Sequence, residues 1–263
     1  MTPAASGDDR ERQGDDSAVS AVGTSPQLFL ARTALAVTSG ARVDGAAIAV
    51  MSTGGARELV FVSNALAQYL DDIQFTAGVG PCLDAFNSGT PVLCPDLKLE
   101  QYHEKWLGFT EDAMAIGATG VFAFPLNGGS TVFGSLELYR ESASDLSTDE
   151  HAAAVRGADT IARLLLADYA VIDGSPPGRE DDGRIWNSDL SRPQVNHAAG
   201  VVSVQLNISI DDAMATMRSR AYSDHRTLSD VADDVVARRL VFRPTGTSAD
   251  SGNDSADNDE NGA

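Results

Sequence analysis

The stretch from Arg192 to Arg243 constrains the fold most, because it holds three short amphipathic helical patterns separated by tight breaks. The third pattern is the most regular, with apolar side chains at the spacing of one helical face: Leu228, Val231, Ala232, Val235, Val236 and Leu240. Thr227 precedes it and Asp230 follows three residues later, which predicts a capping box with Asp in place of Glu. Three such helices predict a compact all-α unit over 190–243, of a kind that suits an output module.

Charge limits where this chain can contact nucleic acid. The 263 residues carry a net charge of -19, so the chain as a whole repels nucleic acid. Between Ser191 and Arg243, however, seven arginines and six aspartates give +1. Any contact with nucleic acid is therefore expected in this segment.

Cysteine content and hydropathy exclude two classes of protein. The two cysteines, Cys82 and Cys94, are too few for a disulfide-built secreted scaffold. No apolar run reaches the roughly 20 residues that a membrane span needs, and the first residues show no signal peptide. The sequence predicts a cytoplasmic protein without membrane contact.

Composition divides the chain into five parts. We expect a disordered arm at 1–24, a sensor domain at 25–172, a linker rich in Pro, Gly and charge at 173–189, the helical unit at 190–243 and an acidic disordered tail at 244–263.

The part from 25 to 172 predicts an α+β domain with one antiparallel sheet flanked by helices. Two pairs of apolar runs predict β-hairpins, 46–51 with 59–62 and 120–126 with 131–139. The remaining segments have helical patterns: 28–37, 65–72, 83–88, 107–116 and a long helix from Thr148 to about Tyr169. If helices cover one face of the sheet, the other face is open to a small-molecule ligand.

The first part resembles a GAF domain over about Ala36 to Leu166. The resemblance is carried by the hairpin order, GVGPCLDAF at 78–86, VLCPDL at 92–97 and the FAFPL-turn-TVFGSLELY ending. It implies a small-molecule sensor, but the sequence does not identify the ligand, the signal or any cofactor.

The helical unit resembles an ANTAR domain, a three-helix output module that binds RNA. The matching stretches are AAGVV at 198–202, IDDAM at 210–214, MRSRA at 217–221 and LSDVA at 228–232. The family's first helix usually reads Ala-Lys-Gly, and this chain has Ala199 in the middle position. Together the two resemblances imply a homodimeric regulator that binds paired hairpins in a nascent transcript and prevents termination.

Five residues are candidates for RNA contact, because guanidinium groups suit phosphates and flat rings suit unstacked bases. They are Arg218, Arg220, Tyr222, Arg226 and His197. The alternative from the residues alone is that they are ordinary solvated side chains, with Arg218 paired to a nearby acid.

The sensor pocket is assigned to Cys82, Asp84 and Trp106. Cys82 stands at a helix N-terminus, which lowers a thiol pKa, but neighbouring Asp84 raises it. From the residues alone, a Cys82 that packs as a small apolar group is favoured, and a core role for Trp106 is as good as a pocket role. The adjacent acids Asp71 and Asp72 are interpreted as a solvated helix face, and the cysteines and four histidines show no metal spacing.

Three functions stay open. The first is a non-catalytic RNA-binding antitermination regulator, and the second is a ligand-sensing or protein-interaction module whose ANTAR domain no longer binds RNA. The third is an enzyme, since some GAF domains reduce free methionine sulfoxide, but those use several cysteines and this chain offers only Cys82 and Cys94.

Overall fold

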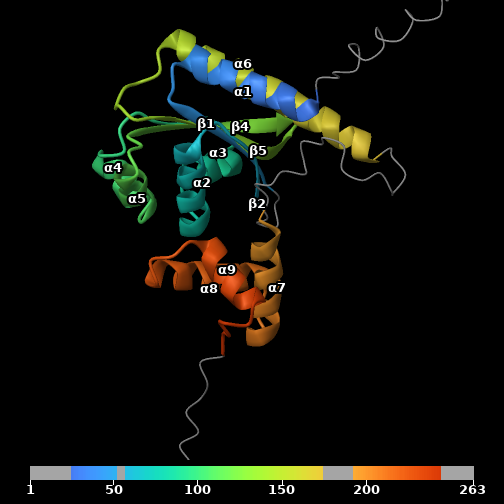
Figure 1. The fold of residues 1–263 in the computed structure, drawn as a ribbon. Helices are drawn as coiled ribbons and strands as arrows, with labels where there is room; N and C mark the ends of the chain where they lie inside the picture. Colours follow the sequence, from blue (N-terminus) through green and yellow to red (C-terminus); the bar gives the residue numbers. More distant parts are fainter. Residues whose placement is uncertain (1–24, 52–56, 174–191, 244–263) are drawn as a thin grey trace, which may run out of the picture.

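The computed structural model describes residues 25–51, 57–173 and 192–243. They form a sheet domain (25–173) and a helical unit (192–243), which lie against each other (Figure 1). The predicted arm, the predicted tail, the turn between the runs 46–51 and 59–62, and nearly all of the predicted linker lie outside the described residues. Among the helices described, none is both long and apolar enough to cross a bilayer.

The sheet is five-stranded and antiparallel, with strand order β2-β1-β5-β4-β3. Its strands are β1 Gly45–Met51, β2 Arg57–Val62, β3 Val92–Cys94, β4 Gly120–Gly128 and β5 Thr131–Arg140. Both predicted hairpins are present, as β1–β2 and β4–β5. The prediction of an α+β domain with an antiparallel sheet and flanking helices is confirmed.

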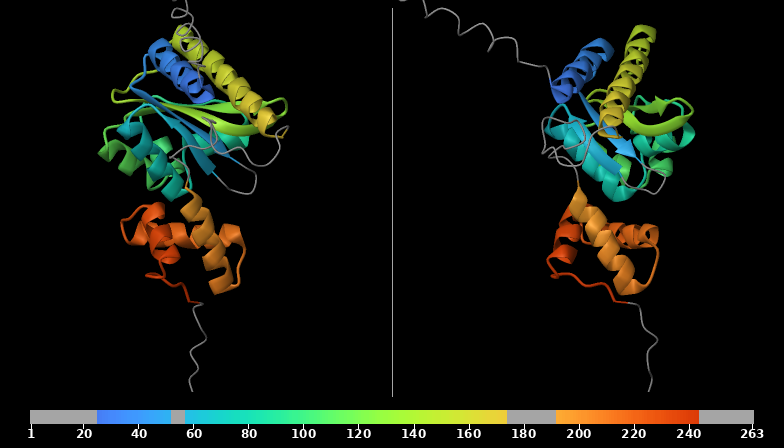
Figure 2. Two further views of the ribbon diagram at one scale, coloured as in Figure 1. Left: turned by 45° about the vertical axis from the view of Figure 1, so that its right-hand side comes forward. Right: turned by 90° about the vertical axis from the view of Figure 1, so that its right-hand side faces the viewer.

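Helices cover both faces of the sheet, as Figure 2 shows. On one face lie α1 (Pro26–Ala41) and α6 (Thr148–Asp173), packed on alternate strand residues such as Ile48 and Phe124. On the other face lie α2 (Ala65–Ala77), α3 (Pro81–Ser88), α4 (Glu100–Lys105) and α5 (Phe109–Ala115). The expectation of one face left open to a ligand is therefore wrong, because the segment between the hairpins folds back over that face.

The helical unit consists of α7 (Pro193–Leu206), α8 (Ile210–Ser223) and α9 (Leu228–Val236). The predicted capping box of α9 is confirmed: Thr227 and Asp230 exchange side-chain-to-backbone hydrogen bonds. α9 ends earlier than the apolar pattern, so Leu240 packs on the core from beyond the helix. The apolar cluster of this unit also includes Phe75 of α2, so one side chain of the sheet domain is part of the core of the helical unit.

Candidate functional site

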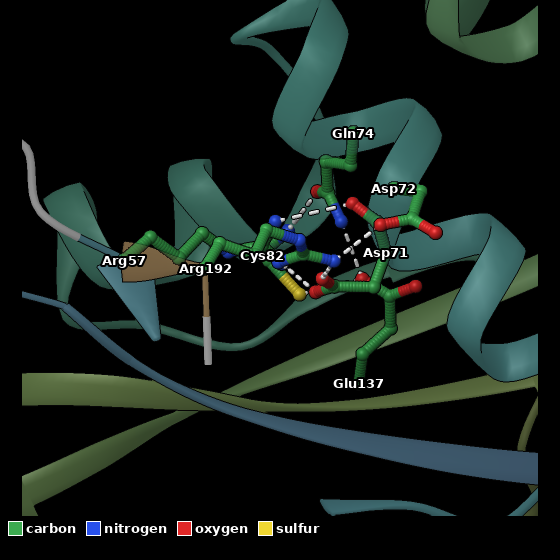
Figure 3. Close-up of polar contacts among 7 residues, drawn as sticks. All are labelled: Arg57, Asp71, Asp72, Gln74, Cys82, Glu137 and Arg192. Atoms are coloured by element: carbon green, nitrogen blue, oxygen red, sulfur yellow. Dashed lines mark hydrogen bonds and ion pairs between the residues drawn. The ribbon is translucent and has the colours of Figure 1, made fainter. Parts of the chain in front are cut away.

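The C-terminal half of α2 brings the sheet, α3 and the helical unit together. Asp71, Gln74 and Phe75 follow the three- and four-residue spacing of one helical face, and each is at most 4% exposed. Asp71 and Gln74 contact groups of the sheet domain (Figure 3). Phe75, in contrast, enters the core of the helical unit. A mixed stripe of acid, amide and aromatic side chains is thus buried where a helix usually buries only apolar ones.

Asp71 is the centre of a buried ion-pair network. Its Oδ1 accepts from Arg57 of β2, and its Oδ2 accepts from Arg192 at the start of α7, with an N–O distance of 2.9 Å. Arg192 also pairs with Asp72. Burial is the largest influence and favours neutral Arg57, but Asp71, Cys82 and Glu137 together outweigh it and raise the pKa of Arg57. One carboxylate therefore ties the sheet to the helical unit.

A second buried cluster surrounds Cys82 at the start of α3. The Cys82 thiol and Nε2 of Gln74 both donate to Oε2 of Glu137 on β5, each at 2.5 Å, and Oε1 of Gln74 accepts from the Cys82 amide at 2.7 Å. Gly80 is required here, because a Cβ at this position would lie 2.4 Å from Oε1 of Gln74. Burial raises the pKa of Cys82 well above its ordinary value, and the Glu137 carboxylate adds to the shift. Cys82 is therefore a poor nucleophile.

The other two residues assigned to the sensor pocket contact each other. The indole Nε1 of Trp106 donates to Oδ2 of Asp84 at 3.0 Å, and Lys105 pairs with the same oxygen at 2.7 Å. Trp106 is 1% exposed, stacks on Tyr102 and meets Phe109 edge-on. Of the two roles that the sequence left open for Trp106, the structure thus places the residue in the core.

The candidate RNA-binding residues fall into two groups. Arg218 and Tyr222 lie between α8 and the sheet domain: Nε of Arg218 donates to the Phe75 carbonyl at 3.2 Å, and the Tyr222 ring lies against Gly108. Burial lowers the pKa of Arg218. The other group pairs within the helical unit or faces solvent: Arg220 pairs with the acid that directly follows α8, Arg226 pairs with one on α9, and His197 lies on the surface of α7.

The structure corrects the interpretation of Asp71 and Asp72, and it adds two residues that the sequence did not indicate. Asp71 is 1% exposed, so the Asp71-Asp72 pair is not a solvated helix face. The spacing in the sequence could have predicted this burial, since Asp71 lies four residues after Ala67 and four before Phe75, on the apolar face of α2. Arg192 and Phe75 were not singled out, because nothing local in the sequence shows that they meet. Within the described residues, no group of three or more acid, His or Cys side chains could hold a metal ion.

Comparisons with known proteins found similar solved structures that cover about half of this chain. No family model matches the chain, and no curated protein matches it. Solved GAF domains of phosphoenolpyruvate-protein phosphotransferases have a similar fold: the one from Acinetobacter is 14% identical with a TM-score of 0.45, and covers 58% of this chain and 89% of that one. The one from Coxiella burnetii is 15% identical with a TM-score of 0.45, and covers 60% of this chain and 91% of that one. A type II free methionine-R-sulfoxide reductase from Thermoplasma acidophilum is 15% identical with a TM-score of 0.38, and covers 53% of this chain and 91% of that one. The similarity is to GAF domains over about half of the chain.

Proposed function

We propose that this chain is a cytoplasmic, signal-responsive regulator that binds hairpin RNA in nascent transcripts through α7–α9 and prevents termination. The observation that carries the proposal is the gathering of Arg218, Arg220, Tyr222 and Arg226 on α8 and the turn after it, on the one segment that is not acidic overall. Tyr222 is 66% exposed, which leaves a flat ring available to a base. The ion pairs of Arg220 and Arg226 are exposed, so a phosphate can replace their carboxylates at little cost.

Replacing Arg218 and Arg220 together with Ala should weaken binding of a twin-hairpin RNA by about ten- to a hundredfold. The slope of log affinity against log salt should fall by about one to two, because one to two phosphate contacts are lost. Filter binding over a series of salt concentrations between about 50 and 200 mM measures both quantities, because affinity falls steeply with salt when phosphate contacts are made. The matched control is Lys98→Ala with Arg156→Ala, which removes two exposed charges from the sheet domain. Equal affinities for both double variants would contradict the assignment.

The signal is proposed to act at the sheet face around Cys82. Three buried polar atoms of this face lack a hydrogen-bond partner among the described residues: Oε1 of Glu137, Oγ of Ser135 and Nε of Arg57. Buried polar atoms normally form hydrogen bonds, so this cluster suits a small polar ligand. Catalysis by the cysteines is not proposed, since burial raises the pKa of Cys82 and takes that of Cys94 to about 12.

A homodimer is proposed through the outer faces of α1 and α6, which lie side by side (Figure 1). Large apolar side chains are exposed there: Leu28, Phe29, Leu35, Leu166 and Tyr169. Leu35→Glu with Leu166→Glu should convert a dimer to a monomer in sedimentation at micromolar concentration, whereas Leu107→Glu on the opposite side of the sheet should not. A monomeric wild type would remove this part of the proposal.

The alternative is a ligand-sensing or protein-interaction module whose helices no longer bind RNA. One observation favours it: Ala199, where the resembled family has a cation, is fully buried in the helical core. Absence of binding to twin-hairpin RNA at low salt, with the helical unit folded and the chain dimeric, would support this alternative.

A further inference from the structure

The end of α2 holds the helical unit through an aromatic ring. Phe75 is 4% exposed and packs with apolar residues of α7, α8 and α9. The guanidinium groups of Arg192 and Arg218 lie over this ring, 4.7 and 5.9 Å from its centroid. Such cation–π contacts strengthen when they are shielded from water, and both arginine side chains are partly buried.

Polar contacts at the same place fix the orientation of the helical unit. Arg192 pairs with the carboxylates of Asp71 and Asp72, and Arg218 donates to the Phe75 carbonyl. The amide of Leu228, the first residue of α9, donates to Oγ1 of Thr76 at 3.2 Å. The sheet domain thus satisfies one of the amides that a helix N-terminus leaves unpaired. We call residues 71–78, from Asp71 to Gly78, the α2 latch.

The latch offers the helical unit the same chemistry that an RNA strand offers. Its carboxylates are anionic oxygens, as phosphates are, and its phenyl ring is a flat surface for guanidinium stacking, as a base is. We propose that the α2 latch competes with RNA for Arg192 and Arg218, so that RNA binds only when the helical unit leaves the sheet domain. This inference rests on the proposed function and adds Arg192 to the residues that contact RNA.

The competition has a quantitative consequence. If RNA binds only the undocked form, its apparent dissociation constant equals the intrinsic constant divided by the undocked fraction. A change that weakens the latch without touching α7–α9 should therefore tighten RNA binding. A merely structural contact between the two parts predicts no such gain.

The latch is also connected to the proposed signal site. Asp71 binds Arg192 with one oxygen and Arg57 with the other, and Arg57 belongs to the buried group around Cys82 and Glu137. A ligand that draws Arg57 toward Glu137 would leave Asp71 to Arg192 alone, and one that displaces Asp71 would release Arg192. Arg57, Asp71 and Arg192 therefore form a continuous series of contacts from the sheet face to the helical unit.

The test uses the full chain and a twin-hairpin RNA. Phe75→Ala should tighten RNA binding by about tenfold or more, and Asp72→Asn, at a more exposed position, by a few-fold. Leu93→Ala, an exposed apolar side chain on β3, is the matched control and should leave the affinity unchanged. Adding Arg192→Ala to Phe75→Ala should lower the RNA affinity again. In the undocked variant Arg192 no longer contacts the latch, so its removal only takes away a contact with RNA.

Docking is measured separately, by spin labels on Lys98→Cys and Val204→Cys. Both positions are exposed, one in each part, while the native Cys82 and Cys94 are buried and escape labelling. If Phe75→Ala or Asp72→Asn lengthens the distance between the two labels but does not raise the RNA affinity, the proposed competition is wrong. The proposal that the chain binds RNA is unaffected by that result. If neither the wild type nor the undocked variants bind RNA at low salt, the proposed function itself fails, and the inference with it.

Discussion

Asp71→Ala should lower the free energy of unfolding by about 3–5 kcal/mol, because it leaves buried charge without a partner. Arg57 and Arg192 both lose their shared carboxylate, and their side chains are only 4% and 10% exposed. Asp72 still pairs with Arg192, so most of the loss should come from Arg57. Urea unfolding, followed by circular dichroism, measures the change.

The matched control is Asp233→Ala, which removes an exposed acid from α9 and should change stability by less than about 0.5 kcal/mol. In the double variant Asp71→Ala with Arg57→Leu, part of the loss should be recovered, since no unpaired guanidinium then remains at β2. A cost for Asp71→Ala as small as that for Asp233→Ala would mean that α2 presents a solvated acidic face after all.

Trp106→Ala should lower the free energy of unfolding by about 3–5 kcal/mol, because the indole fills the core between α3, α4 and α5. The substitution removes the stack on Tyr102 and the edge contact with Phe109, and leaves Asp84 with Lys105 as its partner. Trp106→Phe should cost less, since it keeps apolar volume and loses only the hydrogen bond and part of the packing.

The neighbouring Leu107 supplies the control, because it is 68% exposed and Leu107→Ala should change stability little. Thermal unfolding of the three variants separates a core role from a pocket role. If Trp106→Ala is nearly as stable as the wild type, the side chain lines an open pocket, as the sequence had allowed.

Local patterns predicted the framework of this protein. Short apolar runs with turn residues between them located both hairpins, since strands such as β1 and β4, which helices cover on both faces, are apolar along most of their length. The Thr227–Asp230 capping box was equally visible, because all its groups lie within four residues. Such features depend on neighbours in the chain, which is why they could be predicted without the fold.

The buried charges could not be predicted in the same way. Asp71 and Arg192 are 121 residues apart, and only tertiary folding brings their side chains to hydrogen-bond distance. Acids in a helix usually face solvent, so the interpretation of Asp71 and Asp72 followed the commoner case. Phe75 was similarly hidden, because an apolar residue in α2 looks the same whether it packs on its own sheet or on another unit.

Adding twin-hairpin RNA to the doubly spin-labelled wild-type chain tests the central claim most directly, because RNA binding and domain separation are observed in one sample. We predict one Lys98–Val204 label distance without RNA, and a second, longer distance whose population grows with the amount of RNA bound. If saturating RNA leaves the first distance unchanged, the competition is contradicted, since the helical unit would then bind RNA while still held by Asp71, Asp72 and Phe75.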